Sequence, residues 1–417
     1  MENDFCEYIK EELDIWVRRK PPFSVGAVWH VSENFVEGPK GNLLVTKLYS
    51  DKTLNDLYKT EERLKKIISR AFNVYINILF EKNKNGYYRS IATWVFKRWI
   101  KEINSASSQA IVLAPVINLR VDKKIQIGEI ELYPIKKSGT VVELESQIHN
   151  LLGYPKKRNS VMLAAFSQAY FPFFMHASAL KIEYSFKKPD TFFDYTSWPP
   201  PNYQESVNFV NSFILLLRLF KDKDLRVENY FSALASLFVP SAISYSGNLG
   251  SYAGEEYTLV DQKEINRLRA FYKKILPTLL ESKNLPMHIQ IGIEYFNSSF
   301  QKTKTHERFI DLMISLDALF GVKYETTYRV PLRIACFLEK ETTKRIEMRN
   351  EIEQILRLRG GLFHGDVHPQ TKEREIANAR IYVENIVRKS LVKLLTLFST
   401  GQIGAGYKDT MEVDYIL

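Results

Sequence analysis

The chain has 417 residues, of which 45% are hydrophobic and 25% charged, close to the composition of an ordinary soluble globular protein. This composition excludes a wholly disordered chain, a collagen-like repeat and a pure coiled coil, and the length predicts two or three domains. Lys and Arg total 58 against 48 Asp and Glu, so the formal net charge is +10. Such an excess of cations attracts polyanions but does not identify one.

Cysteine content and hydropathy predict the compartment. The two cysteines, Cys6 and Cys336, lie far apart in the sequence, which excludes a disulfide framework and a zinc site built from cysteines. The longest apolar stretches, 161–175 and 213–220, are shorter than the roughly 18 residues that span a bilayer. The first six residues are acidic where a signal peptide would be basic. We therefore expect a protein of the reducing cytoplasm that does not contact membranes.

Residues 1–198 show the patterns of both helices and strands. Apolar residues recur every three or four positions over 2–19, which predicts an amphipathic helix, and two further helices are expected over 53–80 and 88–104. β-like runs predict strands at 25–31, 42–48, 110–121, 125–135 and 180–186. We interpret this part as an α+β region that regulates or targets the rest of the chain, either by sensing a ligand or a protein partner or by docking a target.

Three consecutive prolines at 199–201 mark a domain boundary, because they fit neither a helix interior nor a central strand. The sequence beyond them is mostly helical. Helices are predicted over 203–221, 228–238, 262–282, 287–301, 305–320, 328–339, 342–358 and 371–399. We divide this half into a helical connector (199–285), a helical domain (286–404) and a tail (405–417). The predicted fold class is α+β, with a mixed N-terminal region and a mostly α-helical C-terminal half.

Two segments have both a ligand-binding and a structural interpretation. The glycine-rich segment 246–254 has the composition to cradle a phosphate, but it lacks the Lys-Ser/Thr of a P-loop and follows no clear strand, so a simple connection is favoured. Rings and cations alternate over 87–99, a mixture that can stack nucleic-acid bases. The same residues fit a helix that buries Ile91, Trp94 and Val95, and we favour this core interpretation.

Arg359 is the most unusual cation of the C-terminal half. In the helix predicted before it, Ile352, Ile355 and Leu356 belong to an apolar stripe, and Arg359 continues that stripe. Arg357 lies on the polar face instead. A guanidinium directed toward an apolar interior needs a partner or an anionic ligand, because an unpaired buried charge is costly.

Asp317 and His364 are the candidate partners of Arg359. Asp317 is expected at the edge of its helix's apolar face, where it would pair with Arg359 or orient His364; a purely structural salt bridge explains it equally well. His364 follows Arg359 by five residues, about 140° around a continuous helix. Gly360 and Gly361 weaken a helix, so we expect it to unwind there and His364 to swing toward Arg359. Taken alone, a histidine before a helix-stopping glycine is more often a cap or packing residue.

Arg359, four further residues and then His364-Gly365 form a pattern that resembles the HEPN superfamily, and more narrowly the ApeA-like HEPN domains. The segments 309–320 and 329–338 add to the resemblance, which covers about residues 286–400. It implies a helical bundle that dimerises, with Arg359 and His364 of both protomers lining a shared cleft that acts as an endoribonuclease without metal or cofactor. It also implies Asp317 as a site residue, in a place where relatives often carry Glu. Relatives of this kind serve in toxin or antiviral defence.

The chemistry suits these residue types independently of the resemblance. RNA is cut by its own 2′-hydroxyl when a base removes that proton and an acid protonates the leaving 5′-oxygen. Imidazole titrates near neutrality and serves in either role, while Arg presents a permanent forked cation to the phosphate oxygens. The expected products are a 2′,3′-cyclic phosphate and a 5′-hydroxyl, and DNA is spared because it lacks the 2′-hydroxyl.

Two alternatives stay open. Gly360 stands where active relatives commonly carry a polar residue that helps to position the phosphate, so a catalytically inactive RNA-binding or assembly module is the second interpretation. His364, Asp366 and His368 alternate, and in an extended chain they would project to one side, as a metal site requires. No further Cys or His cluster accompanies them in the sequence, and we expect an ordinary turn rather than a metal site.

Overall fold

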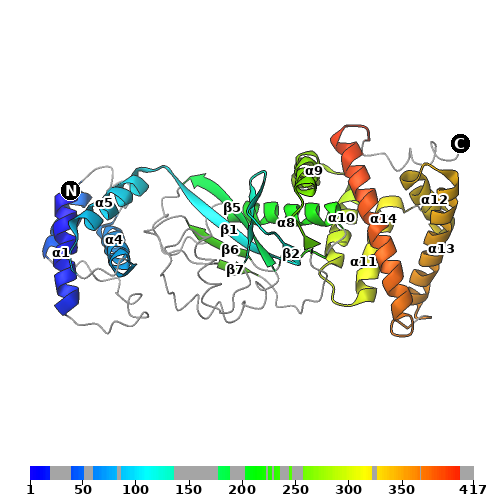
Figure 1. The fold of residues 1–417 in the computed structure, drawn as a ribbon, viewed down its shortest axis with the longest axis horizontal. Coiled ribbons are helices and arrows are strands. Elements are labelled where there is room, and N and C mark those ends of the chain that lie inside the picture. The colour runs from blue at the N-terminus through cyan, green and yellow to red at the C-terminus, as the bar shows by residue number, and fades with distance from the viewer. Residues whose placement is uncertain are drawn as a thin grey trace. The chain divides into compact units, whose positions relative to one another are not determined.

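The computed structural model describes residues 1–18, 39–50, 60–81, 86–135, 177–187, 202–221, 224–227, 230–234, 244–246, 257–321, 326–366 and 368–403. These residues combine helices with an antiparallel sheet, which confirms the predicted α+β class (Figure 1). They belong to two compact units, Met1–Asn208 with Val227–Ser251 and Phe209–Arg226 with Tyr252–Leu417. The strand predicted at 25–31, the tail at 405–417 and most of the segment 246–254 lie outside the described residues. No helix in the described part of the chain is long and apolar enough to cross a membrane.

An aromatic core holds the helices of the first unit together. These helices are α1 (Glu2–Arg18), α2 (Pro39–Tyr49), α4 (Glu61–Glu81) and α5 (Arg89–Asn104). Their largest fully buried side chains are Phe5, Tyr8, Phe72, Tyr75 and Trp99. The helices predicted over 2–19 and 88–104 are confirmed where the structure describes them, and the one predicted over 53–80 begins at Glu61. Ile91 and Val95 are buried as expected, whereas Trp94 is half exposed, so its predicted burial is wrong.

The strand predicted at 42–48 is wrong, because this segment forms the helix α2. Leu44, Val45 and Leu48 are buried, and their spacing places all three on one helical face. That face packs against α1 and α4. In a strand, Leu44 and Val45 would point to opposite sides and only one of them would reach this core.

An antiparallel sheet with the strand order β3-β4-β5-β1-β6-β7 follows the helices in the first unit. Its strands are β1 (Ser107–Ile117), β3 (Ile125–Ile127), β4 (Ile130–Pro134), β5 (Ala177–Lys187), β6 (Tyr230–Leu234) and β7 (Ser244–Ser246). β1 and β5 pair along their whole length, with Ser107 opposite Lys187 and Ile117 opposite Ala177. The strand predicted at 180–186 is thus part of a longer one. The short strands β2 (Leu119–Arg120) and β8 (Tyr257–Thr258) form no part of this sheet.

Three predictions in this region are corrected by backbone geometry and long-range pairing. The strand predicted at 110–121 is interrupted at Asn118, whose φ of 62° is left-handed and incompatible with an extended ladder. The strand predicted at 125–135 is instead the hairpin of β3 and β4, which turns at Gly128 with a φ of 59°. The helix predicted at 228–238 is wrong, because this segment contributes β6, which pairs with β1.

The second unit is a helical bundle. Its helices are the second half of α8 (Tyr203–Phe220), α9 (Gln262–Leu280), the short 3-10 helix η2 (Ser282–Asn284), α10 (Met287–Ser299), α11 (Thr305–Phe320), α12 (Thr326–Leu338), α13 (Thr342–His364) and α14 (Glu373–Ser399). α10 and α11 approach closely at Gly292, where an added Cβ would lie 2.7 Å from Leu319. Ser315 fixes the approach by donating a 2.6 Å hydrogen bond to the Gly292 carbonyl. α13 continues six residues beyond its predicted end at 358.

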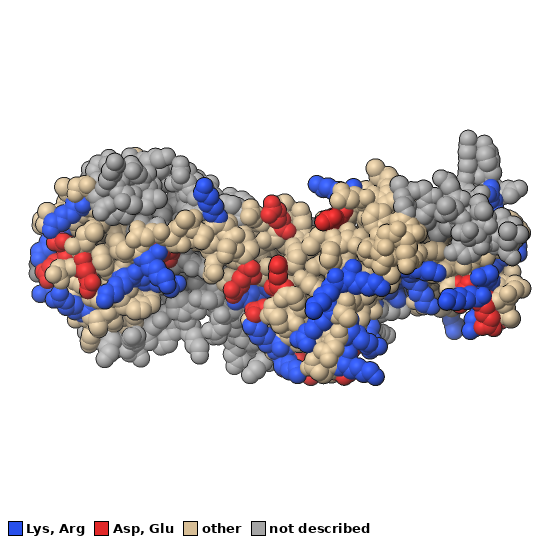
Figure 2. Space-filling model, turned by 90° about the horizontal axis from the view of Figure 1, so that it is seen from above, with Lys and Arg blue, Asp and Glu red and all other residues tan. Residues whose placement is uncertain are grey.

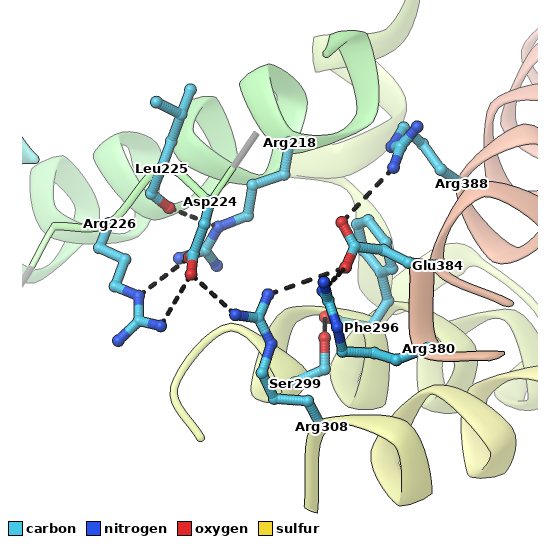
Figure 3. Close-up of polar contacts among 10 residues, drawn as sticks. All are labelled: Arg218, Asp224, Leu225, Arg226, Phe296, Ser299, Arg308, Arg380, Glu384 and Arg388. Atoms are coloured by element: carbon cyan, nitrogen blue, oxygen red, sulfur yellow. Dashed lines mark hydrogen bonds and ion pairs between the residues drawn. The ribbon is translucent and has the colours of Figure 1, made fainter. Parts of the chain in front are cut away.

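Glu384 on α14 is the centre of a buried ionic network in this bundle (Figure 3). Its side chain is 5% exposed and lies 2.7 Å from Arg380 and 3.5 Å from Arg388, each one turn away on the same helix. Arg308 at the start of α11 approaches it to 3.7 Å. A buried carboxylate is tolerated only with such partners, because its desolvation is otherwise uncompensated.

Asp224 extends the network toward the end of α8. Both of its oxygens accept hydrogen bonds from Arg226, at 2.9 and 2.8 Å, and Oδ2 also accepts one from Arg308 at 2.9 Å. Arg218 on α8 donates to the Leu225 carbonyl at 2.8 Å, which holds the loop that carries Asp224. Through Arg308, the two carboxylates tie together α8, α11 and α14.

We predict that Glu384→Gln lowers the free energy of unfolding by roughly 3 kcal/mol, because three guanidinium groups lose their buried counter-charge. Urea unfolding of the full chain measures this. Glu375→Gln is the matched control on the same helix: its pair with Lys372 is half exposed, and the change should cost less than about 1 kcal/mol. Equal losses in the two variants would contradict the central role of Glu384.

Acid should weaken the bundle through Asp224. Burial raises the pKa of Asp224, but the hydrogen bonds from Arg226 and the charges of Arg308 and Arg218 outweigh burial and hold the pKa below its ordinary 3.8. A depressed pKa stabilises the folded state above the unfolded value and loses that contribution as the pH falls toward the folded value. We predict that the free energy of unfolding declines below about pH 4 and that Asp224→Asn flattens this decline. Urea titrations at stepped pH compare the two chains, and parallel curves would refute the assignment.

Candidate functional site

Arg359 and Asp317 form an ion pair between α13 and α11. The Arg359 Nη2 atom lies 2.6 Å from Asp317 Oδ2, and the two side chains are 27% and 26% exposed. Periodicity placed Asp317 at the edge of the apolar face of α11, and the structure places it beside the buried Leu316 and near the helix end. The pair is therefore partly shielded from water, yet reachable by a ligand.

Arg359 and its neighbour Arg357 lie in different environments on α13. α13 buries Ile352, Ile355 and Leu358 on its inner face, and Arg359 lies next to that face. Arg357 is exposed on the opposite side. Arg359 Nε is buried without a hydrogen-bond partner among the described residues, so the guanidinium keeps unused donor capacity.

Phe363 is a neighbour of Arg359 that the sequence analysis missed. The Arg359 guanidinium lies over its ring, 5.1 Å from the centroid, a cation–π contact that orients the cation. The signal was present in the sequence, because residues four apart on a helix contact each other. Phe363 is nevertheless 54% exposed, so one side of the ring is open to solvent or to a second molecule.

The expected unwinding at Gly360 and Gly361 is wrong. α13 continues through both glycines to His364, and only Gly365, with a left-handed φ of 79°, ends it. His364 therefore stays about 140° around the helix from Arg359 and does not swing toward it. Its side chain is exposed. One chain thus brings Arg359 and Asp317 together and leaves His364 apart.

The alternative metal site gains no support. His364, Asp366 and His368 are all exposed, beyond or at the end of α13. Within the described ranges, no group of three or more His, Cys, Asp or Glu side chains has the geometry to hold a metal ion. Asp366 and His368 are better explained by the turn between α13 and α14, where the His368 carbonyl accepts hydrogen bonds from Thr371.

Gly360 lies inside the helix with open space around it. A Cβ built on Gly360 meets no atom within 4 Å. We predict that Gly360→Ala raises the free energy of unfolding by about 0.5–1 kcal/mol, because glycine loses more backbone entropy than alanine in a helix. Urea unfolding of the two chains measures the difference. A destabilised variant would mean that α13 does not continue through this position in solution.

Comparison with known proteins adds no further constraint on this site. The chain matches no protein-family model, and no curated protein or solved structure shows significant similarity to it.

Proposed function

We propose that the chain is a metal-independent endoribonuclease of the HEPN type. Arg359 and His364 are its catalytic residues and Asp317 holds the arginine. The observation that carries the proposal is the partly shielded Arg359–Asp317 pair on the same helix as an exposed histidine five residues later. We place the activity in the cytoplasm, where the cysteines, neither of which forms a disulfide, stay reduced.

The residues supply what cleavage by the 2′-hydroxyl requires. A neutral imidazole removes the proton from the 2′-hydroxyl, whose oxygen attacks the adjacent phosphorus. The bond from phosphorus to the 5′-oxygen breaks, and a protonated imidazole donates a proton to that oxygen. The Arg359 guanidinium faces the phosphate oxygens while their negative charge increases. The products are a 2′,3′-cyclic phosphate and a 5′-hydroxyl.

A second copy of the chain completes this site. One imidazole does not act as base and acid on opposite sides of the same phosphate at once. The continuous α13 also keeps His364 about 140° away from Arg359 within one chain. A symmetric dimer that joins the ends of two α13 helices would bring two histidines and two arginines to one cleft. The half-exposed ring of Phe363 is suited to such a contact.

Asp317 acts through Arg359. Its carboxylate fixes the guanidinium on the side of α11, and the ring of Phe363 holds the neighbouring side. Such pre-orientation lowers the cost of placing the cation against the phosphate. The carboxylate also offsets part of the cation's charge, so phosphate must compete with Asp317 for the guanidinium.

That competition favours one alternative, an inactive RNA-binding or assembly module of the same fold. In this alternative the Arg359–Asp317 pair is purely structural. Gly360, which offers no side chain to the phosphate, points in the same direction. The two functions differ in one respect: only the nuclease requires His364.

We predict that the purified chain cuts single-stranded RNA in EDTA and leaves 2′,3′-cyclic phosphate ends. His364→Ala and Arg359→Ala should each lower the rate constant at least about 100-fold, because each removes a group that acts in the transition state. Arg357→Ala and His368→Ala are the matched controls, an exposed arginine and an exposed histidine close by, and should cut at the parent rate. The gel-resolved products and their end groups measure the result.

The same assay tests the shared cleft. Specific activity should fall as the protein is diluted below the concentration at which light scattering shows dimer. Cleavage that persists in His364→Ala would reject the nuclease mechanism. RNA that stays bound and uncut by the parent chain, with no toxicity on expression, would favour the inactive module.

A further inference from the structure

The helix α9 has a basic outer face. Its inner face is buried in the second unit through Ile265, Leu268, Ile275, Leu276 and Leu279. The exposed cations are Lys263, Arg267, Lys273 and Lys274, which we call the α9 basic face. Figure 2 views the molecule from the side on which α9 lies in Figure 1, and Lys and Arg side chains gather around that place.

The charge of this face is not used within the fold. None of its four cations forms an ion pair among the described residues. The one acid inside α9, Glu264, is buried and pairs with Lys221 at 2.7 Å. Asp261, just before the helix, caps its N-terminus by accepting a hydrogen bond from the Lys263 amide.

Other exposed lysines of the same unit are arranged differently. Lys304, Lys344 and Lys372 each lie within 3.4 Å of a glutamate three residues away. On α9, Lys263 and Arg267 are instead four residues apart with like charge, a spacing that destabilises a helix. A ligand of opposite charge bound along this face would relieve the repulsion.

The spacing of the cations fits an extended anion. Lys263, Arg267 and Lys274 lie within about 40° of one another around the helix and extend along roughly 16 Å of its axis. Lys273 flanks this line. A row of separate positive charges complements a strand of regularly spaced phosphates better than a compact anion. The apolar face of α9 is already buried in the bundle, so the helix has no face left to insert into a lipid surface.

We propose that the α9 basic face binds the phosphate backbone of single-stranded RNA. The inference rests on the proposed ribonuclease function and names the surface that holds its substrate. Binding through phosphates is independent of base sequence, so this face supplies affinity and leaves the choice of cleavage position to other contacts.

The test measures RNA binding without cleavage. Full-length His364→Ala protein binds a labelled single-stranded RNA, and the dissociation constant is followed by anisotropy over a series of salt concentrations. Adding Lys263→Ala, Arg267→Ala and Lys274→Ala should weaken binding at least tenfold and reduce the slope of log K against log salt by about 2, since each lost phosphate contact contributes about 0.7. The thermal midpoint should stay within a few degrees, because all three side chains are exposed.

A matched variant distinguishes an effect of the α9 basic face from an effect of the overall charge of the chain. Lys304→Ala, Lys344→Ala and Lys372→Ala remove the same number of charges from exposed positions of the same unit. This variant should keep the parent affinity and slope. Equal weakening by both triple variants, no weakening by the α9 variant, or preferred binding of the parent to phosphatidylserine vesicles over RNA would each overturn the inference.

The two proposals fail in different ways. If the α9 triple variant with His364 intact cuts RNA with unchanged KM while Arg359→Ala abolishes cutting, the nuclease stands and the α9 surface is rejected. If RNA binding depends on the α9 basic face but no chain cuts RNA, the surface stands and the nuclease is rejected.

Discussion

Two carboxylates, the largely buried Asp224 and the buried Glu384, fix the helices on which the rest of the C-terminal bundle depends. They join the end of α8, the start of α11 and the middle of α14 through Arg308, which contacts both. Asp317 lies nine residues after Arg308 on the same helix, about 14 Å along its axis. The network therefore positions one end of α11, and the helix transmits that position to the candidate site at its other end.

The candidate site links α11 to α13, a helix that buries fewer of its side chains. α13 buries Ile352, Ile355 and Leu358, while most of its first half is exposed. The Arg359–Asp317 pair thus anchors the end of α13 to the better-buried α11. His364 and Phe363 lie just beyond that anchor, on a helix end that is fixed in position but open to solvent. The proposed nuclease would need this combination, since its histidine has to reach both the RNA and a second copy of the chain.

Local periodicity predicted the parts of this site that depend on a single helix. The contrast between Arg359 and Arg357, and the place of Asp317 at an edge, follow from which positions share a helical face. Periodicity did not predict that the helix continues through Gly360 and Gly361. The modest helix-propensity cost of two glycines is outweighed by the hydrogen bonds and packing of a long helix. The buried network was not predictable either: Arg308 and Asp224 are 84 residues apart, and no local pattern links them. The same holds for β6, whose strand pairs with β1, more than 100 residues earlier in the chain, and with β7.

The cations of the bundle are of two kinds, those buried against carboxylates and those exposed to solvent. This difference explains why the net charge of the chain alone says little about function. Arg308, Arg380 and Arg388 are largely buried, and their charge is balanced by Glu384 and Asp224 inside the fold. Such arginines raise the formal charge of the chain without giving it a surface that attracts an anion. The four cations of the α9 basic face are exposed, and the acid of that helix, Glu264, is buried against Lys221. The buried arginines are already neutralised by carboxylates inside the fold, so they attract an anionic ligand only weakly. The α9 cations face solvent without such a counter-charge among the described residues, so they dominate the local attraction of an anion.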